Sequence, residues 1–155
     1  AYRTGERGLT SVENLRTNVK SAQTVRFDGV KVLLAEDNRI NQAFAMDVLE
    51  GLGCQVTVAV NGREAVHQVR DGQFDIVLMD CQMPEMDGFA ATQRILADLG
   101  GNAPPIVALT ANTTARDREK CLAAGMRDFV AKPVNKADLV RVLKRWTNAE
   151  APAAK

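Results

Sequence analysis

Several common residue patterns are missing from this sequence. Its 155 residues include only three cysteines, which are far apart and without C-x-x-C spacing (Cys54, Cys81 and Cys121). This argues against a disulfide framework and a zinc site, and favours a reducing compartment. No apolar run approaches the roughly 18 residues of a membrane-spanning helix, and the N-terminus has no signal-peptide core. We therefore expect a soluble cytoplasmic chain that makes no direct membrane contact.

The sequence also lacks an excess of either charge. Its 20 basic and 19 acidic residues give a formal net charge of +1, which favours neither nucleic acid nor an anionic membrane as a partner. The only histidine, His67, lies in a predicted helix, and the residues around it lack a kinase dimerisation signature. We therefore expect a solvated side chain and no role in phosphotransfer. No glycine-rich ATP motif is present either. Any histidine kinase activity would therefore belong to domains outside this chain.

What the sequence does contain is a regular alternation of apolar and amphipathic segments, with 46% apolar residues overall. Short apolar runs predict five strands, at 30–35, 55–60, 76–79, 106–109 and 128–131. Amphipathic segments predict helices after each strand, at about 39–52, 62–71, 89–99, 114–124 and 136–146. This is an α/β pattern, a doubly wound five-stranded parallel sheet with helices on both faces. Periodicity alone leaves the strand order open.

The ordered domain is expected to span residues 28–148. Residues 1–27 are predicted to be a linker or N-terminal extension, with a short helix over 11–22 as the alternative, and 149–155 a disordered tail. In the first helix of the domain, the apolar residues at three- and four-residue spacing are predicted to face the core: Ile40, Ala43, Phe44, Val48, Leu49 and Leu52. Trp146, near the end of the last helix, is expected to cover the sheet or meet an adjacent domain.

Polar residues stand where the predicted strands end. Asp80 follows the buried run 76–79, and by itself would most simply be a turn or capping residue. Glu36 and Asp37, however, end the first strand, and Thr110 and Lys132 end the fourth and fifth. Because the carboxyl ends of parallel strands share one edge of a sheet, these side chains should converge there.

This convergence indicates a particular chemistry. Three neighbouring carboxylates repel one another, so a cation is expected among them. Oxygen ligands without a Cys/His pair favour a hard ion, Mg²⁺ (or Mn²⁺). A lysine and a hydroxyl beside that cation would form a site for a phosphoryl-sized anion.

The motifs at these strand ends resemble the receiver domain of two-component signalling. They are Glu36-Asp37, Met79-Asp80 followed by a Met-Pro-x-Met-Asp-Gly turn, Leu109-Thr110-Ala111 and Lys132-Pro133. The resemblance covers about residues 29–147. The sequences of these motifs are most similar to those in receivers of hybrid sensor histidine kinases. It implies a flavodoxin-like strand order of 2-1-3-4-5.

The resemblance also implies a role for each residue at the site. Asp80 would be the phosphoacceptor that takes a phosphoryl group from a phosphohistidine. Mg²⁺ would be held by carboxylates of Glu36, Asp37 and Asp80 and by the backbone carbonyl of Gln82. Lys132 would pair with a phosphoryl oxygen. The implied partners are a histidine kinase, a histidine phosphotransfer domain, or both.

Further residues are implied to set the switch and its rate. Thr110 and Phe129 would be the switch pair, and the peptide bond before Pro133 would be cis. Gln82 and Asn112 occupy positions that modulate dephosphorylation. The sequence departs from the commonest pattern in having Glu36 where Asp is usual and Phe129 where Tyr is frequent.

Other functions fit the residues less well. A haloacid-dehalogenase-like phosphatase needs a second Asp two residues after the nucleophile, where this chain has Gln82. A flavin-binding protein of similar topology needs a Ser/Thr/Gly-rich phosphate loop after the first strand. A receiver-fold interaction module without phosphorylation would have lost an acid, the acceptor or the lysine, and none is lost. Cys81, beside Asp80, is expected to be a buried core residue with no redox role.

Overall fold

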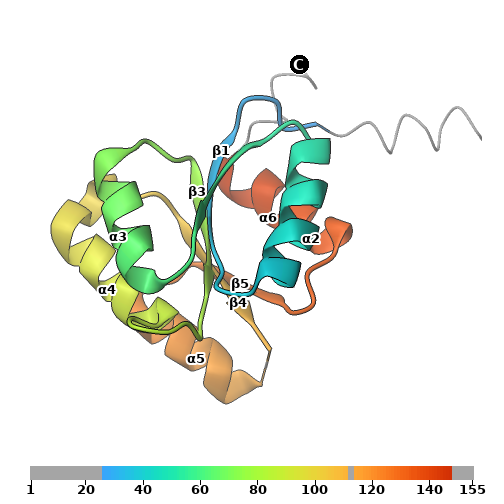
Figure 1. Cartoon of the computed structure of the whole chain (residues 1–155). Helices are drawn as coiled ribbons and strands as arrows, with labels where there is room; N and C mark the ends of the chain where they lie inside the picture. Colours follow the sequence, from blue (N-terminus) through green and yellow to red (C-terminus); the bar gives the residue numbers. More distant parts are fainter. Residues whose placement is uncertain (1–25, 112–113, 148–155) are drawn as a thin grey trace, which may run out of the picture.

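The computed structural model describes residues 26–111 and 114–147, which form a parallel sheet covered by helices (Figure 1). The strands are β1 (Lys31–Ala35), β2 (Gln55–Ala59), β3 (Ile76–Asp80), β4 (Ile106–Thr110) and β5 (Asp128–Ala131). The helices are α2 (Arg39–Gly51), α3 (Gly62–Asp71), α4 (Gly88–Leu99), α5 (Ala115–Ala124) and α6 (Lys136–Thr147), with a 3-10 turn η1 (Gly100–Asn102). The helix suggested over 11–22, the tail from 149, and Asn112 lie outside the described residues.

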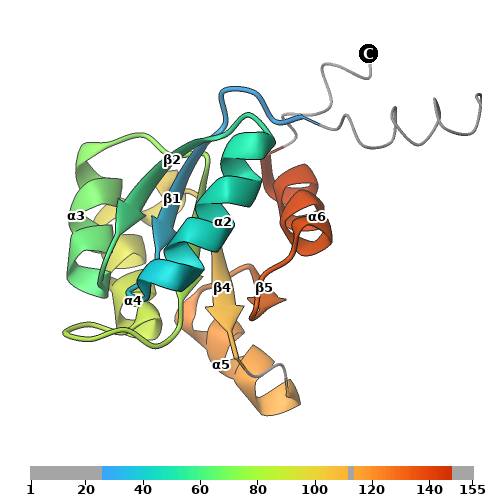
Figure 2. The same cartoon turned by 45° about the vertical axis from the view of Figure 1, so that its right-hand side comes forward.

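The sheet has the order β2-β1-β3-β4-β5, and every neighbouring pair is parallel. This confirms the predicted doubly wound fold and the flavodoxin-like order. Helices α2 and α6 cover one face, whereas α3, α4 and α5 cover the other (Figures 1 and 2). Because successive side chains of a strand point to opposite faces, Leu34 and Leu78 pack under α2 and α6, while Leu33 and Val77 pack under the other layer.

Strand β3 is the centre of the sheet, with β1 and β4 as its hydrogen-bonded neighbours. All five of its residues are buried, including the terminal Asp80, which is only 3% exposed. A carboxylate is rarely buried unless a partner or a ligand compensates its charge. The burial of its carboxylate at the end of the central strand therefore marks Asp80 as a residue whose position needs an explanation.

The prediction for α2 was wrong in part. Ile40 and Phe44, predicted to face the core, are 79% and 48% exposed, and Ala43 is exposed as well. The buried face of this segment is formed by Ala45, Leu49 and Leu52. A step of four residues exceeds the helical turn of 3.6, so apolar residues repeated every four positions drift around the helix. Ile40, the first of them, lies farthest from the buried face.

Phe27, the last residue of the predicted linker or N-terminal extension, packs with the domain. It is fully buried in the core beneath α2 and α6, and its backbone N–H donates to the Leu52 carbonyl over 2.7 Å. His67 is exposed on α3, as expected. The three cysteines are free and buried. Within residues 26–111 and 114–147, no helix is both long and apolar enough to cross a bilayer.

The helix ends follow the capping residues in the sequence. Asn38, Asn61, Asp87 and Thr114 each accept backbone N–H bonds at the start of a helix. Gly125 ends α5 with a φ of 107°, a left-handed conformation that glycine adopts without strain. These local signals begin α2 and α4 directly after the loops that follow β1 and β3, and so position those two loops at the sheet edge.

Trp146 covers the sheet edge at β5, and its ring is half-buried against the core under α2 and α6. Its Nε1–H donates to Asp128 Oδ2 over 3.0 Å. Asp128 is 7% exposed and also accepts from the Phe129 backbone N–H and from Arg141. Burial raises the pKa of Asp128, but these hydrogen bonds outweigh it and leave the pKa below the ordinary value of 3.8. The ionised carboxylate therefore stabilises the last strand and helix.

We expect Asp128→Asn to lower the free energy of unfolding near neutral pH by about 1–3 kcal/mol, as for other buried charged hydrogen bonds. Because the folded-state pKa is depressed, the contribution of Asp128 is complete above the unfolded value and is lost as the pH falls through the folded value. The difference between wild type and variant should therefore shrink below about pH 4. Urea unfolding near neutral pH and at about pH 3 measures this difference in unfolding free energy.

Asp47→Asn, at an exposed position of α2, is the control. A difference that does not change with pH would contradict the assignment.

Candidate functional site

Three carboxylates converge at the carboxyl edge of the sheet. Glu36 and Asp37 follow β1, Asp80 ends the adjacent β3, and a carboxylate oxygen of each lies within 4.8 Å of the others. Glu36 and Asp80 are buried, whereas Asp37 is exposed. The parallel pairing of β1 with β3, which sets Ala35 beside Met79, brings the two strand ends together. The convergence expected from the sequence is therefore present.

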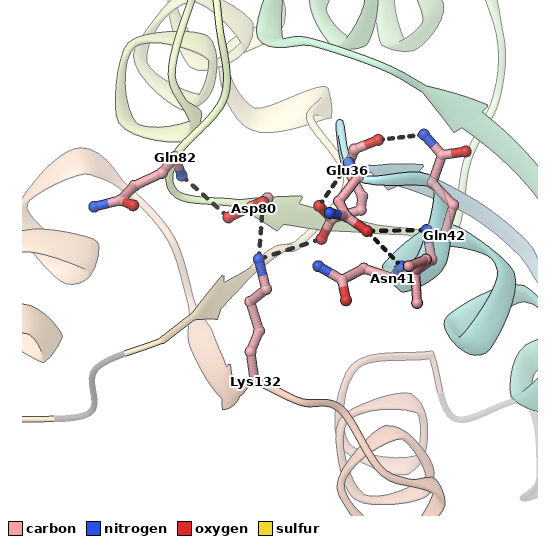
Figure 3. A network of polar contacts seen from close by, with 8 residues as sticks. Glu36, Asn41, Gln42, Asp80, Gln82 and Lys132 are labelled. Carbon is pink, nitrogen blue, oxygen red and sulfur yellow. Dashed lines mark hydrogen bonds and ion pairs between the residues drawn. The ribbon is translucent and has the colours of Figure 1, made fainter.

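Lys132 bridges the two buried carboxylates (Figure 3). Its Nζ lies 3.0 Å from Asp80 Oδ2 and 3.4 Å from Glu36 Oε1. Burial lowers the pKa of this lysine, but the hydrogen bond and charge of Asp80 and the charge of Glu36 outweigh it and raise the pKa. Lys132 is therefore an ammonium ion held at the acidic cluster, on the chain segment just after β5. The Lys132–Pro133 peptide bond is cis.

One ammonium does not balance three carboxylates. Burial raises the pKa of Glu36; the backbone N–H of Asn38 opposes this, and the neighbouring charge of Asp80 adds to it. The excess of negative charge follows from the geometry, because three carboxylates lie within 4.8 Å of one another and a single ammonium contacts them. A cluster of oxygen donors with excess negative charge fits a hard divalent cation such as Mg²⁺.

The loop after β3 forms one wall of the site. The Gln82 backbone N–H donates to Asp80 Oδ1 over 3.1 Å (Figure 3), which fixes one carboxylate oxygen while Lys132 binds the other. Gly88, at the end of this loop, lies so close to β3 that an added Cβ would meet the Asp80 carbonyl oxygen. The Met86 carbonyl accepts from the Gly62 N–H at the start of α3, over 3.0 Å. The turn from Pro84 to Gly88 is thus held against α3 at Met86 and against the end of β3 at Gly88.

A small cavity opens beside Asp80. It has a volume of about 80 Å³ and is lined by Asp80, Gln82, Thr110 and Lys132 among others. Thr110 ends β4 and is 8% exposed. Phe129 is half-buried in β5, and the Arg118 guanidinium lies 5.0 Å from its ring centroid. Asn112, expected to flank this cavity, lies outside the described residues.

Cys81 lies next to Asp80 along the chain but belongs to the core, at 6% exposure. Burial and the neighbouring Cys121 raise the pKa of its thiol well above the ordinary value. A buried protonated thiol is a poor nucleophile and a poor metal ligand. The expectation of a buried core cysteine is therefore met.

Two features of the site had no role in the interpretation of the sequence. The first is Gln42, whose Nε2–H donates to the Glu36 carbonyl oxygen over 2.6 Å (Figure 3). No motif signals such a bond, because it depends on the angle at which α2 leaves β1. The second is an apolar pocket of about 240 Å³ that adjoins Glu36 and Lys132 and is lined by Ile40, Phe44, Pro133 and Val134 among others. The unusually wide spread of apolar residues around α2 could have indicated it.

Comparisons with known proteins agree with this geometry. Residues 32–144 match the family model described as the response regulator receiver domain. The chain is 45% identical over 130 residues to hybrid signal transduction histidine kinase B of Dictyostelium discoideum, an alignment that covers 76% of this chain and 7% of that protein. The chain therefore spans only a small part of this curated relative.

Solved structures extend the comparison. The receiver domain of sensor histidine kinase PA1611 from Pseudomonas aeruginosa, with a magnesium ion coordinated in its active-site cleft, superimposes with a TM-score of 0.72 at 45% identity, covering 77% of this chain and 98% of that one. The receiver domain of Ssk1 from Saccharomyces cerevisiae, in complex with the histidine phosphotransfer protein Ypd1, gives a TM-score of 0.75 at 32% identity, covering 81% and 93%. Both the family match and the identities show what this chain is: it belongs to the response regulator receiver domain family.

Proposed function

We propose that this chain takes a phosphoryl group from a phosphohistidine onto Asp80 in a Mg²⁺-dependent phosphorelay. The observation that carries the proposal is the convergence of three carboxylates and Lys132 on the end of β3. In the reaction, a carboxylate oxygen of Asp80 forms a bond to phosphorus as the phosphorus–nitrogen bond breaks. The electron pair of that bond returns to the imidazole nitrogen, and an acyl phosphate is the product.

Glu36, Asp37, Asp80 and the Gln82 backbone carbonyl would hold the metal, with Mn²⁺ as an acceptable substitute at an all-oxygen site. When bound, the cation supplies positive charge that offsets the charge of the transferring group. Lys132 is placed to exchange its contact with Asp80 Oδ2 for one with a phosphoryl oxygen, because its ammonium already lies 3.0 Å from the acceptor. Glu36 would keep the lysine in position during that exchange.

Thr110 and Phe129 are proposed as the switch pair. Thr110 lines the cavity beside Asp80, so a phosphoryl group there would draw its hydroxyl inward. Movement of Thr110 would leave space for the ring of Phe129 in the adjacent strand, where Ala108 is its partner in register. The face formed by α5, β5 and α6 would then change. Gln82 and Asn112 are proposed to influence the lifetime of the phosphorylated form.

The partner surface is proposed to be the apolar pocket at α2. Ile40 and Phe44 are large apolar side chains in contact with solvent, and the pocket between them and Pro133–Val134 adjoins Lys132 and Glu36. A histidine kinase or histidine phosphotransfer domain bound there would present its histidine to Asp80. An exposed apolar patch beside a reactive group is a usual site for a protein partner.

The parent protein is proposed to be a hybrid sensor histidine kinase in the cytoplasm, because relatives such as the Dictyostelium kinase carry the matching segment. The receiver domain would run from Phe27 to about residue 148, with residues before it as a linker and 149–155 as a tail. Phe27 is included because it is packed in the core.

Incubation with acetyl phosphate tests the proposal without a partner protein. We expect the intact protein to gain the mass of one phosphoryl group when Mg²⁺ is present, and to gain nothing when EDTA removes the metal. Mass spectrometry of the intact chain measures both. Absence of a gain with Mg²⁺ would overturn the proposal and favour a receiver-fold interaction module that is not phosphorylated.

A further inference from the structure

The side chain of Gln42 reaches back from α2 to the loop that carries two of the acidic residues. We define residues 36–38 as the acidic loop. The Gln42 Nε2–H donates to the Glu36 carbonyl oxygen over 2.6 Å, and Figure 3 shows the amide turned toward that carbonyl. The Gln42 backbone N–H donates to the Asn38 carbonyl over 2.9 Å. One residue of α2 is therefore bonded to both ends of the acidic loop.

The other bonds of the loop restrain different groups. The Glu36 backbone N–H donates to the Ala59 carbonyl over 2.9 Å, which continues the pairing of β1 with β2. The Asn38 N–H donates to Glu36 Oε2 over 3.1 Å, which orients the Glu36 carboxylate. The Glu36 carbonyl belongs to the peptide plane that leads into Asp37, and the bond from Gln42 restrains that plane. The orientation of the plane sets the direction in which the Asp37 side chain leaves the backbone.

Asp37 needs such a restraint more than the other two carboxylates do. Glu36 and Asp80 are buried and bound to Lys132, whereas Asp37 is exposed. Repulsion from its two neighbours would turn an unrestrained Asp37 carboxylate toward solvent. A metal ion would then have to order the loop as it binds, and its affinity would fall.

We infer that Gln42 is a positioning residue of the metal site, one that orders the acidic loop before the cation binds. The inference rests on the proposed function, since it concerns the same Mg²⁺ site. Gln42 touches neither the cation nor the reacting atoms. It acts through the peptide plane between Glu36 and Asp37.

A simpler explanation is that Gln42 only stabilises the start of α2. Asn38 already serves that purpose, because its Oδ1 accepts from the backbone N–H groups of Ile40 and Asn41 over 2.9 and 3.0 Å. The two explanations differ in what they predict for the metal. A structural role predicts a lower melting temperature at unchanged Mg²⁺ affinity, whereas a positioning role predicts weaker Mg²⁺ binding by a folded protein.

The test compares two variants of Gln42 with a control. Gln42→Met keeps the length of the side chain without the donor, and Gln42→Ala removes both. The control is Gln68→Ala, because Gln68 is an exposed glutamine of α3. Isothermal titration calorimetry should show Mg²⁺ dissociation constants about tenfold weaker for both Gln42 variants, the lower end for the loss of an outer hydrogen bond at a metal site. Gln68→Ala should match the wild type. With acetyl phosphate, the Gln42 variants should need more Mg²⁺ for half-maximal phosphorylation and approach the wild-type rate at saturation.

Two results would overturn the inference while leaving the proposed function intact. One is a Gln42 variant that binds Mg²⁺ as tightly as wild type; the other is an equal loss in Gln68→Ala. A wild type that binds no Mg²⁺ or is not phosphorylated would overturn both the inference and the proposed function.

The wild type also offers a check that needs no variant. The side-chain amide signals of Gln42 in nitrogen-15 NMR should shift during a Mg²⁺ titration with the same dissociation constant as the Asp37 backbone amide, and constant signals would count against the inference.

Discussion

Replacement of Asp80 by Asn is expected to abolish phosphorylation by acetyl phosphate and by any phosphohistidine donor. An amide oxygen is a far weaker nucleophile than a carboxylate, and no other carboxylate occupies the same position. Glu36 is buried, and its Oε1 already lies 3.4 Å from the Lys132 ammonium. Asp37 is exposed and extends from a different strand end. The mass of the intact variant should not change under conditions that fully modify the wild type.

The same substitution should separate chemistry from folding. It removes one of three mutually repelling carboxylates, but also a hydrogen-bonded partner of Lys132. These effects oppose each other, so we expect the stability without metal to change by only about 1 kcal/mol. Stabilisation by Mg²⁺, which reaches about 2.7 kcal/mol for a ligand at 100 times its dissociation constant, should largely disappear. Thermal unfolding with and without Mg²⁺ measures this. A phosphoryl gain that survives in Asp80→Asn would disprove the assignment of the acceptor.

Replacement of Phe44 by Asp is expected to block transfer from a phosphorylated histidine phosphotransfer domain while leaving the reaction with acetyl phosphate unchanged. Phe44 is 48% exposed and lines the apolar pocket beside Lys132. Its ring is thus available to a protein partner and is not needed by a small donor. Loss of an aromatic anchor at an interface costs about 2 kcal/mol or more, roughly a 30-fold weaker interaction. Ile40→Asp should act in the same direction.

Leu122→Asp is the matched control for this experiment. Leu122 is another exposed apolar residue, 58% exposed, but it lies on α5 on the opposite face of the sheet from α2. Transfer rates from the phosphorylated partner and from acetyl phosphate would be measured for all three variants. Equal loss in Leu122→Asp, or a parallel loss with acetyl phosphate in Phe44→Asp, would show that the α2 pocket is not the docking surface.

The acidic loop links the proposed metal site to the proposed partner surface. The acidic loop carries Glu36 and Asp37, and α2, which starts directly after it, carries Ile40 and Phe44. A partner that binds α2 is therefore about one helical turn from the residues proposed to hold the metal. Gln42 joins the two, since it belongs to α2 and is bonded to the Glu36 carbonyl. Part of the proposed partner surface and two of the proposed metal ligands therefore belong to one continuous segment of the chain.

Most of the site could be predicted because it depends on strand ends. Asp80, Thr110 and Lys132 each follow a short apolar run, and parallel strands bring their carboxyl ends to one edge whatever their order. The chemistry of the residues then identified the site as one for a cation and a phosphoryl group. The residue roles came from the resemblance to receivers, as did the order 2-1-3-4-5, which the sheet confirms.

The failures lie where burial depends on neighbours that the local pattern does not report. The four-residue spacing of Ile40 and Phe44 predicted a buried face, yet no described element covers the start of α2 and both side chains are exposed. Phe27 stands at the end of a polar stretch that the sequence predicts to be a linker or N-terminal extension, yet its side chain is fully buried beneath α2 and α6. In each case the apolar character was evident from the sequence, but the covering partner was not.

By itself, then, the sequence determined five strand–helix units and the gathering of Glu36, Asp37, Asp80 and Lys132 at one edge. Both follow from periodicity and from the direction of the chain, which are local properties. Only the tertiary structure decided which side of α2 faces solvent, how Lys132 is shared between Glu36 and Asp80, and that Gln42 is bonded to the acidic loop. Those features depend on distances between segments that are remote in sequence or on the angle between a strand and a helix, and packing of the whole domain sets both.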